Sequence, residues 1–408
     1  ILMGYIKIDA EEIMEINCGD IIGQVLSQQG VQFLFTLCGG HISPILIGAK
    51  KAGIRVIDVR DEVNAVFAAD AVGRITGVPG VAAVTAGPGV TNSLTALKNA
   101  QMAQTPLILL GGAAPTVLKN RGALQDIDQL SLLKSIAKMA ITITRNCDVV
   151  PVVEKAFDVC RSGVPGPVFI ECPIDILYNE SLVRQWYGAK PDAERKSGMR
   201  SKLLDFYLQR HVDQMFACEF EDMKPGGYKV VSPDIASRSV SKALELVAMS
   251  QRPVLIVGSQ ATLQPDNIDK LAGAVGSLGM PTYLTGMARG LLGRSHPMQM
   301  RHQRKKALQK ADLVIIAGMP CDFRLNYGRS IGSGARIMAV NRSKTDLKLN
   351  CRPDLAVHSD PFLFLCSLAD AFVPEPSAWE AWIQELKKND DEREAFITKT
   401  SEEDTEFV

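Results

Sequence analysis

Three absences in the 408-residue sequence narrow the class of the protein. Positive and negative side chains balance, with 45 Lys and Arg against 45 Asp and Glu. Nothing therefore indicates a nucleic-acid partner, which would require a strongly basic surface. No stretch approaches ~18 uninterrupted apolar residues, so no membrane-spanning helix is expected. No signal peptide is visible either, although the chain starts with Ile1 and not Met, which leaves room for a missing N-terminal segment.

Paired cysteine motifs are also lacking. The nine cysteines are scattered, their number is odd, and no two of them form a C-x-x-C pair. This pattern favours free or buried thiols in a reducing compartment over a disulfide framework. The cysteines are Cys18, Cys38, Cys147, Cys160, Cys172, Cys218, Cys321, Cys351 and Cys366.

The composition that remains is that of an ordinary globular protein. Apolar residues make up 46% of the chain and charged residues 22%, which is enough apolar material for full-sized cores. At roughly 100–200 residues per domain, the length predicts two or three domains. No short-period repeat and no low-complexity segment interrupts the chain.

Residues 17–178 alternate short apolar runs with helical patterns. Continuous apolar strands that alternate with helices predict a parallel sheet covered on both faces. One of the helices is rich in Ala and starts near Val63. The expected strands are Val31–Leu37, Arg55–Val59, Val81–Thr85, Pro106–Leu110, Ala140–Thr144 and Val168–Cys172.

Residues 179–231 are expected to form a linker. Lys190–Lys202 is charged and weakly hydrophobic. Apolar residues from Leu203 to Phe216 then recur near helical spacing and predict an amphipathic helix, which either docks on a neighbouring domain or lies on a membrane surface.

Residues 232–374 repeat the strand–helix pattern and predict a second, Rossmann-like domain, so the fold class is α/β with two consecutive doubly wound parallel sheets. Residues 375–408 hold one predicted helix, Trp379–Lys388, and an acidic tail. The strands expected in this second domain are Pro253–Val257, Pro281–Leu284, Leu313–Ala317 and Arg336–Val340.

Candidate ligand-binding residues follow the strands of the first domain. In open parallel sheets, ligands bind at the carboxyl ends of the strands. Glycines there let the backbone approach a ligand closely, and a carboxylate beside them is a candidate acid or base. On this evidence alone the chain is an α/β ligand-binding protein, most simply an enzyme. The loops are Gly39-Gly40-His41, Arg60-Asp61-Glu62, Gly87-Pro88-Gly89 and Gly111-Gly112.

The order of these motifs resembles a known family. Arg60-Asp61-Glu62 leads into the Ala-rich helix and a Thr76-Gly77 break, and Thr85–Asn92 follows with the pattern T-x-G-P-G-x-x-N. Asn99–Pro106 and Gly122–Gln129 come next in the same order. This arrangement is similar to the pyrimidine-binding domain of thiamine-diphosphate enzymes. Residues 232–374 resemble the central domain of that family through Gly258-Ser-Gln260, Gly286–Gly290 and Cys321–Arg324.

Within the family, the Gly39-Gly40-His41 loop is similar to the branch that contains benzaldehyde lyase and the 2-hydroxyacyl-CoA lyases. That resemblance implies cleavage of a 2-hydroxyacyl-CoA to formyl-CoA and an aldehyde one carbon shorter. Two alternatives stay open. One is carboligation of the acetolactate synthase type, against which His41 counts, because that branch has apolar residues in the loop. The other is a non-catalytic pairing or regulatory chain.

The resemblance also implies roles for individual residues. Glu62 would hydrogen-bond N1′ of the cofactor's aminopyrimidine and shuttle the proton that activates C2 of the thiazolium ring, although alone it reads as a solvated carboxylate at a helix start. Its neighbour Asp61 departs from the commoner His of the family. His41 would take the proton of the substrate's 2-hydroxyl, or be structural. Gln125 would orient a carbonyl.

Three further residues belong to the predicted cofactor side. Gly87 and Pro88 shape a loop near the pyrimidine. Asn92 either faces the cofactor or serves only as an N-cap of the next helix.

One departure from the family matters for the cofactor. The family binds Mg²⁺ and the diphosphate through a G-D-G motif and an Asn about 25–30 residues on, and no G-D-G occurs here. The metal ligands are therefore expected in a third domain outside these residues. The family builds its site from two subunits, which implies a homodimer or homotetramer at full length and an inactive fragment here.

The central domain leaves its own ligand open. Gly258, Arg289, Asp322 and Arg324 stand at predicted strand ends, and relatives hold FAD or ADP in this domain while others have lost the nucleotide. Arg301–Lys306 either meets the phosphates of CoA or forms a solvated helix face. The resemblance further implies a location at the endoplasmic reticulum membrane through an N-terminal anchor that precedes these residues.

Overall fold

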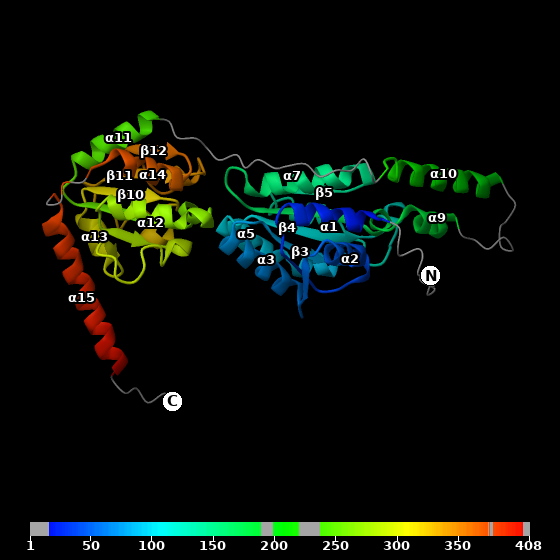
Figure 1. Cartoon of the computed structure of the whole chain (residues 1–408), viewed down its shortest axis with the longest axis horizontal. Helices are drawn as coiled ribbons and strands as arrows, with labels where there is room; N and C mark the ends of the chain where they lie inside the picture. Colours follow the sequence, from blue (N-terminus) through cyan, green and yellow to red (C-terminus); the bar gives the residue numbers. More distant parts are fainter. Residues whose placement is uncertain (1–15, 189–198, 220–236, 374, 376–377, 403–408) are drawn as a thin grey trace. The chain divides into compact units, whose positions relative to one another are not determined.

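The computed structural model describes residues 16–188, 199–219, 237–373, 375 and 378–402. These fall into two compact units, one on either side of the boundary between residues 230 and 231 (Figure 1). Each unit is built around its own sheet. The segment Lys190–Lys202, predicted as a linker, lies largely outside the described residues.

The first unit is a six-stranded, all-parallel sheet in the order β2-β1-β3-β4-β6-β5. The predicted parallel sheet is confirmed. Every residue of its three central strands is buried, as expected for apolar runs covered on both faces. The strands are β1 (Phe33–Thr36), β2 (Arg55–Asp58), β3 (Gly80–Val84), β4 (Leu107–Ala113), β5 (Met139–Thr142) and β6 (Pro167–Pro173).

Helices cover this sheet and create two apolar cores. One core joins the sheet to α1, α2 and α7, and the other joins it to α3 and α5. The helices are α1 (Cys18–Gln28), α2 (Ser43–Lys51), α3 (Glu62–Thr76), α4 (Pro88–Asn92), α5 (Leu94–Ala103), α6 (Gln129–Leu133), α7 (Val149–Arg161), α8 (Ile174–Leu177), α9 (Glu180–Gly188) and α10 (Met199–Met215).

The start and the end of α3 are fixed by their sequence. The Asp61 side chain accepts a hydrogen bond from the Val63 backbone N–H at 3.0 Å and caps the first turn. Gly77 ends the helix in the left-handed conformation with φ 72°, which a glycine adopts without steric cost. The N-terminal cap sets Glu62 as the first residue of α3, four positions after β2 ends at Asp58.

The second unit is also a six-stranded parallel sheet, in the order β12-β11-β10-β7-β8-β9. Its strands are β7 (Pro253–Val257), β8 (Thr282–Leu284), β9 (Gln299–Met300), β10 (Leu313–Ala317), β11 (Arg336–Asn341) and β12 (Leu355–His358). Its helices are α11 (Ser237–Ala248), α12 (Ile268–Ser277), α13 (Arg304–Lys310), α14 (Pro361–Ala371) and α15 (Glu380–Glu402).

The last helix is longer than predicted. The sequence indicated a helix over Trp379–Lys388, whereas α15 continues to Glu402. Contacts beyond Lys388 support the continuation. Asp390 accepts from the backbone N–H groups of Arg301 and His302 at 2.7 and 2.8 Å, and Glu394 Oε2 lies 2.6 Å from His302 Nε2.

The predicted amphipathic helix is α10, and it divides into two parts. Val212, Met215 and the following Phe216 are buried in the core of the first unit. Toward its N-terminal end, Leu203 and Phe206 are exposed. The helix therefore docks on the first unit by its C-terminal end. In the described parts of the chain, no helix is long and apolar enough to cross a bilayer.

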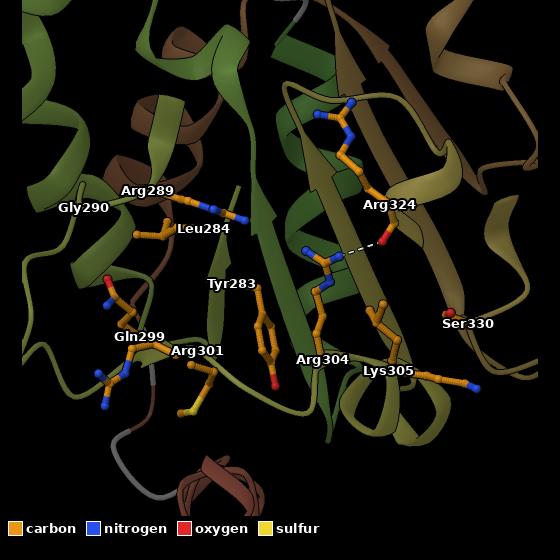
Figure 2. A pocket seen from close by; sticks show the side chains of 12 residues that line it. Tyr283, Leu284, Arg289, Gly290, Gln299, Arg301, Arg304, Lys305, Arg324 and Ser330 are labelled. Carbon is orange, nitrogen blue, oxygen red and sulfur yellow. Dashed lines mark hydrogen bonds between the residues drawn. The ribbon is translucent and has the colours of Figure 1, made fainter. Parts of the chain in front are cut away.

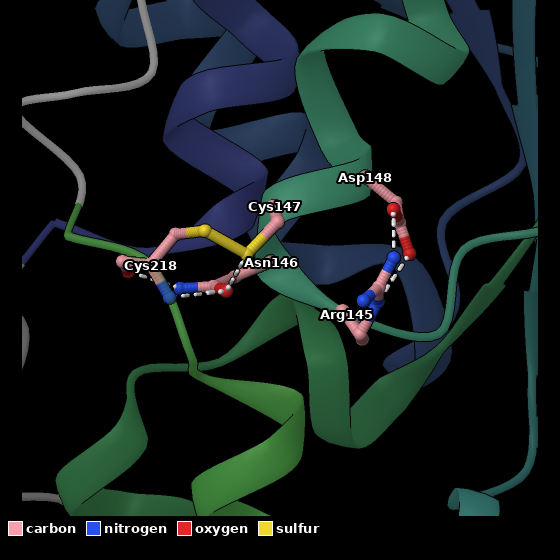
Figure 3. The surroundings of a disulfide bond; sticks show 5 residues. All are labelled: Arg145, Asn146, Cys147, Asp148 and Cys218. Atoms are coloured by element: carbon pink, nitrogen blue, oxygen red, sulfur yellow. Dashed lines mark hydrogen bonds and ion pairs between the residues drawn. A yellow bond between two sulfur atoms is a disulfide. The ribbon is translucent and has the colours of Figure 1, made fainter.

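The prediction that all cysteines are free is wrong for two of them. Cys147 and Cys218, which are 71 positions apart, form a disulfide that ties the segment after α10 to the start of α7 (Figure 3). Asn146 reinforces the junction, because its side chain donates to the Cys218 carbonyl at 2.6 Å and accepts from the Cys218 N–H at 3.2 Å. The seven other cysteines are free thiols.

Removal of this disulfide is expected to lower the free energy of unfolding. A cross-link that closes a loop of this length lowers the conformational entropy of the unfolded chain. It thereby raises the free energy of unfolding by about 4 kcal/mol. The double variant Cys147→Ser/Cys218→Ser should therefore unfold at a lower urea concentration than the parent chain. Reductant should destabilise the parent and leave the double variant unchanged. An equal effect of reductant on both proteins would contradict the pairing.

Candidate functional site

The loops singled out in the sequence meet at one edge of the first sheet. Because β1 to β4 run parallel, their carboxyl ends lie at the same edge. His41 follows β1 in a short 3₁₀ turn, Glu62 follows β2, and Thr85–Gly89 follows β3. Gln125 lies in the segment after β4. The structure thus brings together residues that are up to 84 positions apart.

Glu62 is a buried carboxylate, with 6% of its surface exposed. Asn92 donates from Nδ2 to Glu62 Oε2 at 3.0 Å. The other oxygen, Oε1, faces Gly89, where an added Cβ would approach to 3.4 Å. A larger side chain at position 89 would crowd this oxygen, so the glycine keeps one face of the carboxylate accessible.

The alternative interpretation of Asn92 as an N-cap is wrong. Asn92 is the last residue of α4, and the next helix, α5, is preceded by Ser93. Its amide is directed instead to Glu62. Asn92 therefore belongs to the surroundings of the carboxylate.

His41 and Gln125 are linked through a third side chain. His41 is buried, with 7% of its surface exposed, and its Nδ1 lies 3.3 Å from Thr85 Oγ1. The Thr85 hydroxyl donates to Gln125 Oε1 at 3.5 Å. Burial lowers the pKa of His41, so the ring is neutral near pH 7.

Thr85 was not singled out in the sequence beyond its place in the T-x-G-P-G motif. Its hydroxyl is what joins the two predicted substrate-side residues. Gln125 is held at φ +61°, a conformation that costs energy for a residue other than glycine and tends to occur at functional sites.

Gly87 connects the Glu62 side of the site to the His41 side. Its φ of +63° favours glycine, and an added Cβ would come within 2.8 Å of the Gln125 carbonyl. Its N–H donates to Gln129 Oε1 at 2.9 Å. Sequence reasoning did not identify Gln129 as part of the site, because nothing in its local pattern shows this contact.

A cavity of about 270 Å³ borders Gln125 and Gln129. Buried Glu171 and partly exposed Lys119 lie in its wall, 2.7 Å apart between carboxylate and ammonium. The remaining lining residues are the acidic Asp126 and residues that are small, apolar or hydroxyl-bearing: Ala113, Ala114, Thr116, Ile127, Thr142, Thr144 and Pro173.

The site has the residues for the organic half of a thiamine-type cofactor and lacks those for its metal. Across the described residues, no group of three or more His, Cys, Asp and Glu side chains is arranged to hold a metal ion. Glu62, with its accessible Oε1, suits a protonated ring nitrogen. No described cluster is arranged for the cation that accompanies the diphosphate.

The second unit contains a larger, cationic cavity of about 540 Å³ (Figure 2). Predicted residues Arg289 and Arg324 line it, and Arg301, Arg304 and Lys305 add three further cations. The predicted residues Gly258 and Asp322 are not among its lining residues. The apolar part of the wall comes from Tyr283, Leu284, Met300 and Leu308.

Few acidic groups balance these cations. Asp322 pairs with Arg324 at 2.9 Å, and Glu394 lies 3.9 Å from Arg301. Arg304 donates to the Arg324 carbonyl at 2.6 Å, and burial lowers the pKa of Arg304. Within the described part of the chain, Arg289, Arg304 and Lys305 have no carboxylate within 4 Å. A cavity with unpaired guanidinium groups suits a phosphate-bearing ligand.

Two family models match the chain. Residues 16–132 match the thiamine pyrophosphate enzyme N-terminal TPP-binding domain, and residues 240–368 match the thiamine pyrophosphate enzyme central domain. The first match covers β1 to β4 and the second covers all six strands of the second sheet, which agrees with the resemblance seen in the sequence.

Curated relatives agree with these matches. The 2-hydroxyacyl-CoA lyase 2 of Homo sapiens is 45% identical over 381 residues, which cover 92% of this chain and 60% of the relative. The Caenorhabditis elegans protein of that name is 45% identical and matches 94% of this chain and 60% of its own. A probable acetolactate synthase of Mycobacterium bovis is 30% identical, and the match covers 93% of this chain and 62% of the relative. The chain spans about three fifths of the length of these relatives.

Proposed function

This chain belongs to the thiamine pyrophosphate enzyme family, whose N-terminal and central domains it carries. We propose that it is part of a carbon–carbon lyase. The proposed reaction cleaves a 2-hydroxyacyl-CoA to formyl-CoA and an aldehyde one carbon shorter, a step of fatty-acid α-oxidation. The observation that carries the proposal is buried Glu62, held by Asn92 with its second oxygen open beside Gly89. The 45% identity to proteins named 2-hydroxyacyl-CoA lyase 2 supports the substrate class.

The chain's own residues would prepare the cofactor from one side. Thiamine diphosphate, when bound, supplies a nucleophilic carbon and an electron sink. Glu62 Oε1 would hold a proton at the pyrimidine ring nitrogen, while Asn92 fixes the orientation of the carboxylate through Oε2. The Gly87-Pro88-Gly89 loop would lie against the ring. The diphosphate and Mg²⁺ are proposed to bind a domain outside these residues.

The hydrogen bonds of His41 suggest how it acts on substrate. The Thr85 hydroxyl donates its hydrogen to Gln125, so Thr85 Oγ1 is left to accept from His41 Nδ1. In the neutral ring this leaves Nε2 without a proton, and therefore as a base. His41 Nε2 would accept the 2-hydroxyl proton, and the Gln125 amide would orient the carbonyl next to it.

Acetolactate synthase-type carboligation is the second candidate, favoured by the 30% identical relatives of that name. His41 argues against carboligation, because a base in this loop is suited to cleaving a 2-hydroxy compound. The test supplies pyruvate and a long 2-hydroxyacyl-CoA side by side to the protein with its diphosphate-binding domain present. Formyl-CoA as product supports the lyase, and acetolactate as product would replace it with the carboligase.

A non-catalytic pairing chain remains the third candidate, since no described cluster suits the metal. The parent transcript discriminates the two cases. A G-D-G motif followed by an Asn about 25–30 residues later supports a lyase with a homodimeric or homotetrameric site. A transcript that ends without them supports the pairing role. The proposed location at the endoplasmic reticulum is tested by imaging the product of the same transcript.

The cationic cavity of the second unit is proposed to bind a phosphate-bearing ligand, with ADP, FAD or the nucleotide part of CoA as candidates. Arg304→Ala is expected to weaken ADP binding about 10-fold or more, because a charge-assisted hydrogen bond to a phosphate is lost. Isothermal titration of the 408-residue chain measures the effect. Arg336→Ala, at the start of β11 and outside the lining, is the matched control and should bind as the parent does. Equal affinity of the parent and both variants would contradict this use of the cavity.

A further inference from the structure

Gln129 is a buried amide whose hydrogen bonds join three separate strand ends. Only 2% of its surface is exposed, and it opens α6. Its Oε1 accepts from the Gly87 N–H at 2.9 Å, while its Nε2 donates to the Gly112 carbonyl at 3.1 Å and to Glu171 Oε1 at 3.0 Å. One partner is an obligate donor and two are acceptors, so only one orientation of the amide satisfies all three.

Glu171 fixes that orientation from the other side. It lies on β6 with 1% of its surface exposed. Its Oε2 accepts from Lys119 Nζ and from Thr142 Oγ1, both at 2.7 Å. A buried carboxylate of this kind is tolerated because each oxygen has a partner and a cation stands beside it. Networks with all members satisfied are rigid, which suits them to hold a loop in place.

The loop that Gln129 holds contacts both halves of the candidate site. Thr85 precedes Gly87 and bonds to His41 and Gln125, whereas Gly89 follows it and lies beside Glu62. Gly87 itself has φ +63° and ψ −107°, so its backbone lies outside the regular regions. Glycine adopts this conformation without steric cost but has no side chain that restricts its backbone, so contacts such as the hydrogen bond from its N–H to Gln129 fix it.

We infer that Gln129 and Glu171 are positioning residues, which set the distance between the Glu62 side and the His41 side of the site by clamping the Gly87 N–H. Neither residue reaches the two groups that are proposed to move protons. Their effect passes through the backbone of Gly87 and through Thr85. The catalytic consequence rests on the proposed function, whereas the clamp itself does not.

The primary test is made on the 408-residue chain and needs no turnover. Gln129→Met keeps the length of the side chain and removes all three hydrogen bonds. Amide hydrogen exchange at Gly87 is expected to become at least 10-fold faster, because the N–H loses its acceptor, Gln129 Oε1. The pKa of His41, followed by NMR, is expected to rise toward 6.5 as Thr85 shifts and water reaches the ring.

Thr142→Val is the matched control. It removes one partly buried hydrogen bond to Glu171 and leaves the three bonds of Gln129 in place. It should lower the melting temperature by less than Gln129→Met, because one hydrogen bond is lost instead of three, and leave Gly87 exchange within twofold of the parent. A role in stability alone would move the melting temperature of both variants and leave Gly87 and His41 unchanged in both, which would overturn the inference.

Gln129→Asn is a second variant that tests the same hydrogen bonds if Gln129→Met does not fold. It retains a polar amide in the same place but is one methylene too short to reach Gly87 while bonded to Glu171. It is expected to speed Gly87 exchange as Gln129→Met does. In the protein with its diphosphate-binding domain, both variants should lower kcat with little change in KM. A parent protein without turnover would refute the proposed function and leave the exchange result standing, so the two failures are distinct.

Discussion

Replacement of Glu62 by Gln is expected to lower turnover of the complete enzyme by about 10²- to 10⁴-fold, the usual contribution of a positioned acid–base group. The amide has nearly the shape of the carboxylate, so Asn92 keeps a partner at this position and the fold is preserved. What is lost is the ability of Oε1 to accept and hold a proton beside Gly89. Formation of formyl-CoA under saturating thiamine diphosphate and Mg²⁺ measures the effect.

Asp61→Asn provides the control for this prediction. Asn is as good an N-cap as Asp, so the first turn of α3 keeps its hydrogen bond to Val63. The control should retain turnover within a few-fold of the parent and unfold at the same temperature. Full activity of Glu62→Gln in a folded protein would remove Glu62 from the mechanism and, with it, the main support for the thiamine-dependent lyase.

The sheets were predictable because their signal is local. In β7 and β10 a run of apolar residues ends at Gly258 or Gly318, and the predicted and observed bounds agree at both ends. Such runs are diagnostic because strands buried on both faces carry no alternation. By contrast, β9 has two residues and β12 has exposed ones, so neither presents an apolar run that a sequence pattern could detect.

Long-range contacts were not predictable from one sequence. The disulfide depends on α10 returning to the start of α7, and no spacing rule links cysteines 71 positions apart. The length of α15 depends on Asp390 capping the backbone after β9. For the same reason the motif indicated Glu62 but not Gln129, whose partners are contributed by three different segments.

His41 is expected to produce the second large effect. His41→Asn should lower lyase turnover by about 10²- to 10⁴-fold, because Nε2 is the proposed acceptor of the 2-hydroxyl proton and Asn offers no base at that position. Asn retains an amide N–H near the place of Nδ1, so the link to Thr85 and Gln125 is maintained. His358→Asn, at the end of β12 in the second unit, serves as the control and should leave turnover unchanged.

The pH dependence distinguishes a base from a structural histidine. Burial lowers the pKa of His41 below its ordinary 6.5, and the active form is the neutral ring. Activity should therefore be present above the lowered pKa and fall as the pH decreases through it, which places the acidic limb of kcat/KM below pH 6.5. Stability depends on pH in the same direction. Because the pKa of His41 is lower in the folded than in the unfolded state, stability is lost as the pH falls and the ring protonates.

In His41→Asn the residual activity should lack this acidic limb. If the limb persists unchanged in the variant, the proton acceptor is another group and the assignment of His41 fails. Unaltered acetolactate formation by the variant would instead favour the carboligase.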